Sequence, residues 1–127
     1  MKKFLSLISV IAISCSLRAQ TSDFDMSKMK TYYIIFLKKG PHRDQDSATT
    51  AKIQEEHLAY LGGLYKEGKI DINGPFTDDG DIRGISVYNT ASEDEARQLA
   101  SNDPAVKSGR IVIEIHPWYA MKGSSLR

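Results

Sequence analysis

Apolar positions along the chain follow two different periods, which predict strands and a helix in its first half. Tyr32–Leu37 is apolar on both alternating faces, as in a strand that is covered on both sides. From 48 to 67 apolar side chains recur every three or four positions, which predicts a helix that ends at Gly68. Strand patterns return at 70–76 and 82–89 on either side of an acidic turn, so a hairpin should follow the helix.

The second half of the chain repeats the order helix and strand. Ser92 and Glu95 stand three residues apart, the spacing of a capping box, and predict a helix from Ser92 that stops at Asp103 before Pro104. Residues 110–115 alternate and predict the last strand. The order strand–helix–strand–strand–helix–strand, with right-handed crossovers, predicts an α+β ferredoxin-like β-α-β-β-α-β sandwich with both helices on one face of the sheet.

The apolar character of both faces of the first strand also predicts a partner. Helices cover only one face of such a sheet, and a chain of this length has no further element to cover the other. A second copy is the simplest cover. The sequence therefore predicts a homodimer whose sheets pack face to face.

The first nineteen residues have the pattern of an export signal. Lys2 and Lys3 precede the apolar or small residues 4–15, a run too short to remain as a membrane-spanning helix. We expect residues 1–19 to be a signal peptide cleaved after Ala19, and the protein to be periplasmic or secreted. A second interpretation is a lipobox that leaves a lipid-anchored Cys15 as the first mature residue.

The remaining chain predicts one domain without a strong charge bias. Residues 20–31 are polar and are expected to form a flexible leader, 32–121 the domain and 122–127 a tail. Loss of the signal peptide leaves 14 of the 17 basic side chains against 16 acidic ones. Such a balance gives no electrostatic reason to expect nucleic acid, or a membrane apart from the possible anchor, as a partner. Cys15 is the only cysteine, so the mature domain should have no disulfide.

Two polar residues on apolar helical faces are the candidates for catalysis. His57 lies on the apolar face of the first predicted helix, and Asp103 lies at the end of the second. Because these helices run antiparallel in the predicted fold, both side chains should point toward the sheet at one end of the molecule. A histidine held by a carboxylate is suited to act as a general base. The alternative is a hydrogen-bonded core histidine and an aspartate that only terminates a helix.

Five short motifs then connect the chain to a known family. In sequence order they are His57-Leu58-Ala59-Tyr60-Leu61, Glu67-Gly68-Lys69, Gly74-Pro75-Phe76, Asp103-Pro104-Ala105-Val106-Lys107-Ser108-Gly109 and His116-Pro117-Trp118. Across about 31–120 the chain resembles the YciI-like proteins, which carry a YCII-related domain. The resemblance implies a dimeric ferredoxin-like α/β barrel with its active His–Asp pair at His57 and Asp103. An export signal is a departure from these usually cytoplasmic proteins.

Four further residues are candidates for substrate binding. Arg43 precedes the first helix and could hold an anionic group, although a solvated loop charge is the simpler interpretation. Ser86 could donate to a substrate oxygen or only tolerate a packed interface. Trp118 and Tyr119 could form an aromatic wall of the pocket or pack at a strand end.

The sequence shows no pattern that calls for a cofactor or a metal. No glycine-rich phosphate loop, nucleophile elbow or cofactor fingerprint is present, and His42, His57 and His116 lack ligand spacing on one element. We therefore predict a cofactor-independent lyase or isomerase that abstracts a proton from a small cyclic or aromatic compound. The alternative is a non-catalytic dimeric module of the cell envelope that binds a small ligand.

Overall fold

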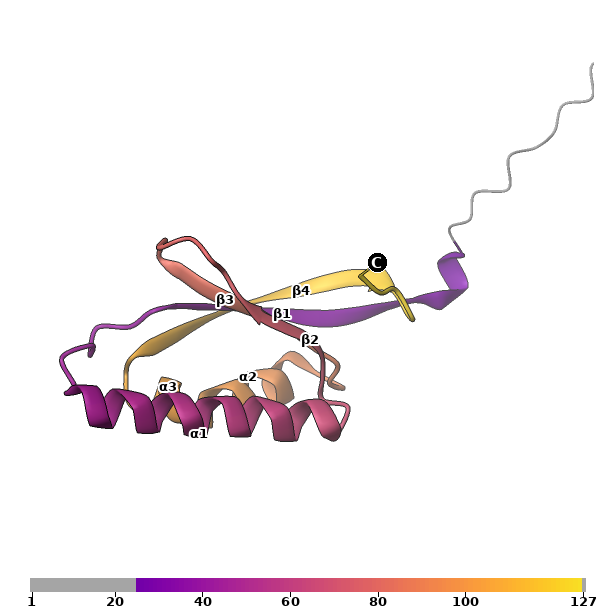
Figure 1. Ribbon diagram of the computed structural model, residues 1–127. Coiled ribbons are helices and arrows are strands. Elements are labelled where there is room, and N and C mark those ends of the chain that lie inside the picture. The colour runs from indigo at the N-terminus through magenta and orange to yellow at the C-terminus, as the bar shows by residue number, and fades with distance from the viewer. Residues whose placement is uncertain (1–24, 127) are drawn as a thin grey trace, which may run out of the picture.

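The computed structural model describes residues 25–126, which form one antiparallel sheet with helices on one side (Figure 1). The strands lie in the order β2-β3-β1-β4. This is the predicted α+β ferredoxin-like arrangement, which the structure confirms. In chain order, a short 3-10 turn at Met26–Lys28 precedes the elements β1 (Met29–Lys39), α1 (Ser47–Lys66), β2 (Ile70–Pro75), β3 (Ile82–Tyr88), α2 (Glu93–Ser101), α3 (Pro104–Lys107) and β4 (Ile111–Met121).

The predicted signal peptide, residues 1–19, lies outside the described residues, together with the start of the predicted leader and Arg127. The prediction of a flexible leader up to residue 31 is wrong at its end, because β1 already begins at Met29, which pairs with Met121. β1 is longer than expected because β4 is also extended, and the additional residues of β4 supply backbone hydrogen-bond partners to the start of β1. Within 25–126 no helix is both long and apolar enough to cross a membrane.

Both α1 and α2 begin after a residue whose side chain caps the helix. The Asp46 carboxylate accepts the Thr49 backbone N–H at 2.8 Å at the start of α1. Ser92 Oγ accepts the Glu95 N–H at 3.2 Å at the start of α2, as predicted. The Glu95 carboxylate reaches back one residue further than a standard capping box, to the Ala91 N–H at 2.9 Å.

The segment around Asp103 differs from the prediction. The second helix was expected to run to Asp103, but α2 ends at Ser101 and a separate short helix, α3, begins at Pro104. Proline at the first helical position has a favourable φ and needs no hydrogen-bond acceptor, so Pro104 starts a helix here. Asp103 is the residue that caps it.

The last strand is longer than the alternating pattern of 110–115 predicts. β4 continues through Pro117 to Met121, at the edge of the sheet. An edge strand tolerates proline because one side of its backbone has no strand to bond. Trp118 therefore lies within the strand, opposite Tyr32 of β1, and not beyond its end.

The sheet has one face covered by helices and one face that is open in the single chain (Figure 1). The main core lies under the helices and includes Ile35, Ile70 and Tyr88 from the strands and Leu61 and Leu64 from α1. A second, smaller cluster lies on the open face and consists of Tyr32, Val87 and Ala120 with the half-buried Ile34 and Ile72. Both faces of β1 are therefore apolar, as the sequence predicts.

Candidate active site

His57 and Asp103, 46 positions apart in the chain, form a direct hydrogen bond. His57 Nδ1 lies 2.7 Å from Asp103 Oδ2. The Asp103 side chain is 2% exposed and the His57 side chain 12%, so the bond is shielded from water while the ring keeps some access to solvent. The contact predicted from the sequence is present. The catalytic role of the pair stays a prediction.

Both oxygens of the Asp103 carboxylate are bonded, which fixes the orientation of the pair. Oδ1 accepts the Ala105 backbone N–H at 2.8 Å, the capping bond of α3. Oδ2 is then directed at His57 Nδ1, which must carry the proton if the carboxylate is ionised. The lone pair of the neutral imidazole is therefore on Nε2, the nitrogen that can accept a proton.

Two tyrosines, the buried Tyr88 and the half-buried Tyr60, lie close enough to Asp103 to feel its charge. Burial raises the pKa of Tyr88, and the negative charge of Asp103 raises it further. The pKa of Tyr60 is raised by the same two causes, burial first. Tyr60 Oη also donates to the Leu99 carbonyl at 2.9 Å, which ties α1 to α2. Both phenols therefore stay neutral at physiological pH.

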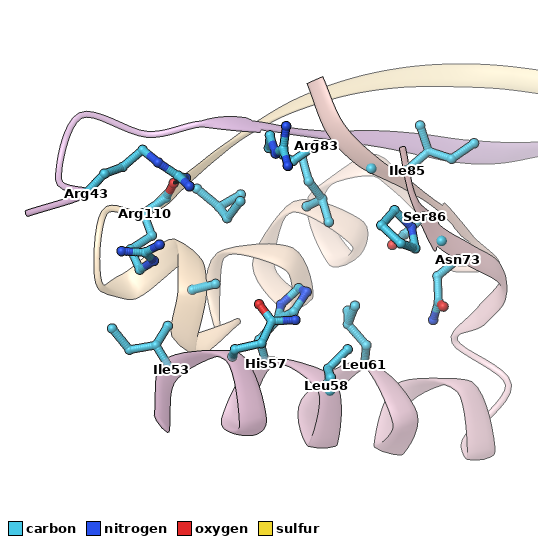
Figure 2. Close-up of a pocket in the computed structure, with 17 residues that line it drawn as sticks. Arg43, Ile53, His57, Leu58, Leu61, Asn73, Arg83, Ile85, Ser86 and Arg110 are labelled. Atoms are coloured by element: carbon cyan, nitrogen blue, oxygen red, sulfur yellow. Dashed lines mark hydrogen bonds between the residues drawn. The ribbon is translucent and has the colours of Figure 1, made fainter. Parts of the chain in front are cut away.

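A cavity of about 310 Å³ lies between α1 and the sheet, and His57 is on its wall (Figure 2). Its apolar walls come from both layers of the fold. They include Ile53, Leu58 and Leu61 of α1 and Leu37 and Ile111 of the sheet. The volume is near the lower limit for small-molecule sites, which restricts a ligand to about the size of one ring.

Two arginines reach the same cavity from neighbouring segments. Arg43, a predicted site residue, donates from Nη1 to the Arg110 carbonyl at 3.1 Å. Arg110 was not predicted; its Nη1 donates to Gln45 Oε1 at 2.7 Å and to Thr50 Oγ1 at 3.3 Å. The only feature of the sequence that could have indicated a role for Arg110 was its position directly after Gly109. That position lies at the end of the sheet where His57 was expected.

A close approach of two glycines holds this end of the cavity together. Gly40 N–H donates to the Arg110 carbonyl at 2.8 Å, and a Cβ at Gly40 would lie 2.2 Å from the Gly109 carbonyl oxygen. Gly109 has φ of +73°, which favours glycine. The loop that carries Arg43 is thereby fixed against the segment that carries Arg110.

Ser86, also predicted as a site residue, lines the cavity from β3. The residue is 1% exposed, and its Oγ is the one buried side-chain polar atom between residues 25 and 126 without a hydrogen-bond partner. Asn73, which sequence reasoning missed, lies directly opposite on β2 and lines the same cavity. An unpaired buried hydroxyl is costly for folding, so its presence at a cavity suggests a use in binding.

The substitution Ser86→Ala should therefore cause no loss of stability, and a gain of up to about 1 kcal/mol, because it removes a buried group that makes no hydrogen bond. Thr90→Val is the matched control. Thr90 is also buried, but its Oγ1 donates to the Ser92 carbonyl at 2.9 Å, so its loss should cost about 1 kcal/mol. Urea denaturation measures both. A larger loss for Ser86→Ala than for Thr90→Val would contradict the assignment.

Two residues expected at this site lie elsewhere. Trp118 is on the open face of the sheet, 43% exposed, with its ring centroid 6.3 Å from that of Tyr32. Tyr119 is 58% exposed and does not line the cavity. The sequence left open an aromatic wall of the pocket or packing at a strand end, and neither residue lines the His57 cavity of the single chain. The reason is the length of β4, which carries them beyond the cavity and alternates them between the two faces.

The three histidines considered as metal ligands are separated. His116 lies on the open face with Nε2 at 2.7 Å from Glu114 Oε1, and His42 lies against Gly109. In the described part of the chain, no group of three or more His, Cys, Asp or Glu side chains could hold a metal ion.

Two solved structures share the fold of this chain. One is 5-chloro-2-hydroxyhydroquinone dehydrochlorinase (TftG) from Burkholderia phenoliruptrix AC1100, in complex with 2,5-dihydroxybenzoquinone. It is 28% identical with a TM-score of 0.52, and the match covers 68% of this chain and 92% of that one. The other is muconolactone isomerase, at 14% identity and a TM-score of 0.59, covering 76% and 96%, which shows the fold alone.

Sequence comparison gives the family directly. No curated protein matches the chain. The YCII-related domain matches residues 31–119, which include most of β1 and β4 and every element between them. This match agrees with the motifs around His57 and Asp103 and with the observed topology. The chain belongs to the YCII-related domain family.

Proposed function

We propose that this protein is a small-molecule enzyme in which His57 abstracts a proton from a cyclic or aromatic substrate and Asp103 orients the imidazole. The observation that carries the proposal is the 2.7 Å bond between His57 Nδ1 and Asp103 Oδ2 at the wall of a cavity. Asp103 stabilises the imidazolium that forms when Nε2 accepts the proton.

The proposed step needs no electron acceptor and no cofactor. His57 Nε2 takes a proton from carbon, and the C–H electron pair forms a new carbon–carbon double bond. In an elimination, the leaving group departs with its own bonding electrons. In an isomerisation, the imidazolium returns the proton to another carbon of the conjugated system. Ser86 Oγ, which lines the cavity, would donate a hydrogen bond to the ring oxygen on which negative charge develops.

The dehydrochlorinase comparison supports this class of reaction. A dehydrochlorinase removes a proton and a chloride from its substrate, which is an elimination, and that structure holds a quinone of one ring. A cavity of about 310 Å³ is of a suitable size for such a molecule. The chain spans nearly the whole length of that protein, so the comparison includes the complete domain.

The proposal includes a homodimer and export. The open face of the sheet carries Ile34, Phe36 and Trp118, and a second copy packed on this face would bury them. Export rests on the pattern of residues 1–19, and mass spectrometry of protein isolated from the cell envelope would detect cleavage after Ala19 or lipidation at Cys15.

Proton exchange tests the proposed function directly. The wild-type protein is incubated in D₂O with a panel of small hydroxylated or lactone ring compounds. It should catalyse the exchange of a ring C–H of one compound for deuterium, and proton NMR would follow the loss of that signal. His57→Gln should lower the exchange rate by about 100- to 10,000-fold, because glutamine cannot accept the proton. His42→Gln is the matched control, since His42 is exposed and does not line the cavity.

The alternative is a non-catalytic dimeric module that binds a small ligand in the same cavity. In such a module the hydrogen bond between His57 and Asp103 would have no catalytic role. Such a module would bind ring compounds but exchange no proton, and His57→Gln would change only its affinity. That outcome would contradict the enzymatic proposal.

A further inference from the structure

The polar groups of the cavity are divided between two ends. Figure 2 shows Arg43 and Arg110 at one end, Ser86 and Asn73 at the other, and His57 between them. The middle is lined by apolar side chains of α1 and of the sheet. No aspartate or glutamate is among the lining residues, so the cationic end is not balanced within the cavity.

The guanidinium groups at the cationic end make hydrogen bonds only to neutral acceptors. Arg43 donates to a backbone carbonyl, and Arg110 donates to the Gln45 amide and the Thr50 hydroxyl. Neither forms an ion pair with a carboxylate among residues 25–126. Arg83, which also lines the cavity, is different because its Nη1 lies 3.2 Å from Asp79 Oδ1.

This arrangement favours an anion. The exposed Arg43 donates to the Arg110 backbone carbonyl, and both arginines line the same cavity, where neither has a counter-ion. The Gln45 and Thr50 contacts use Nη1 of Arg110 and leave its other nitrogens available. Guanidinium groups bind planar carboxylates through paired hydrogen bonds, so a carboxylate is the complementary group.

The opposite end favours an uncharged oxygen. Ser86 Oγ has no partner in the described chain, and Asn73 lies next to it across the β2–β3 pair. A hydroxyl or carbonyl oxygen of a ligand would satisfy the Ser86 hydroxyl. The cavity volume of about 310 Å³ suits one ring with polar groups on opposite sides.

We propose that the substrate class is a small ring compound with a carboxylate at the Arg43–Arg110 end and a hydroxyl or carbonyl oxygen at the Ser86–Asn73 end. This specificity deepens the proposed function, on which it rests. Placed in this way, the ring lies between the two ends with a C–H directed at His57. Arg43 and Arg110 select the ligand, and His57 performs the chemistry.

Binding measurements without turnover test the inference. By isothermal titration calorimetry on the whole purified protein, para-hydroxybenzoate should bind at least about 10-fold more tightly than the neutral para-hydroxybenzamide, because only the acid pairs with the arginines. It should also bind more tightly than benzoate, which lacks the oxygen for Ser86. Ser86→Ala should remove this second difference and keep the first.

Variants of the arginines supply the controls. Arg43→Gln should weaken the binding of para-hydroxybenzoate about 10-fold or more and leave the affinity for the amide unchanged. Arg43→Lys should recover part of the lost affinity. Arg97→Gln is matched, because Arg97 pairs with Glu93 on the outer side of α2 and lines no part of the cavity. Equal binding of acid and amide, equal effects of Arg43→Gln and Arg97→Gln, or no binding of any probe would overturn the inference. A protein that selects the acid but exchanges no proton would instead contradict only the enzymatic proposal.

Discussion

Asp103→Asn should lower turnover by about 100- to 10,000-fold while the protein stays folded. The asparagine carbonyl can still accept the Ala105 N–H that caps α3, so the local structure is retained. Its amide group then faces His57 Nδ1 and donates to it. The imidazole is held in the other tautomer, with the proton on Nε2, and can no longer accept a proton from substrate. Steady-state kinetics of any substrate found in the exchange assay measure the loss.

A second measurement separates this effect from unfolding. Circular dichroism and urea denaturation should show a folded Asp103→Asn protein, and nitrogen-15 NMR of the histidine ring should show the change of tautomer. Asp94→Asn is a matched control on the exposed start of α2 and should retain full activity. Full activity of Asp103→Asn with an altered tautomer would contradict the proposed role of the pair.

Phe36→Lys should convert the protein from dimer to monomer and raise the dissociation constant about 100-fold or more. Phe36 lies on the open face of β1, directly opposite Glu114 on β4. In a monomer the new ammonium group is solvated and can pair with Glu114. In a dimer with face-to-face sheets it would be buried against the second copy, at a cost of several kcal/mol. Sedimentation equilibrium over micromolar concentrations measures the change.

The control for this substitution lies on the other side of the molecule. Gln98 is an exposed residue of α2, which covers the opposite face of the sheet, and Gln98→Lys should leave the association unchanged. A wild-type protein that sediments as a monomer throughout this range would contradict the proposed dimer. Equal dissociation by Phe36→Lys and Gln98→Lys would place the interface elsewhere.

The order of the elements and the candidate pair were predictable because they depend on local physics. Strand and helix periods, Ser92 as a helix cap and Gly68 as a helix end depend only on residues nearby in sequence. His57 could be assigned because its helical face is set by the neighbours on α1. Asp103 was assigned to the right end of the fold for a partly wrong reason, since it caps α3 and does not end α2.

Other features depend on pairing between distant segments, which the sequence pattern does not reveal. Whether Trp118 reaches the His57 cavity depends on how far β4 extends and on which residue of β1 it faces, since alternate residues lie on opposite faces. Arg110 joins Arg43 only because Gly40 and Gly109 can approach closely across the end of the sheet.

The sequence by itself determined the family through its short motifs. It also determined the order of strands and helices, apart from α3, and the meeting of His57 with Asp103, because short-range periodicity and one simple topology suffice for these. Tertiary structure alone decided which other side chains share that cavity. Its cationic end, its unpaired Ser86 hydroxyl and the exclusion of Trp118 all follow from strand register and loop contacts between residues far apart in the chain.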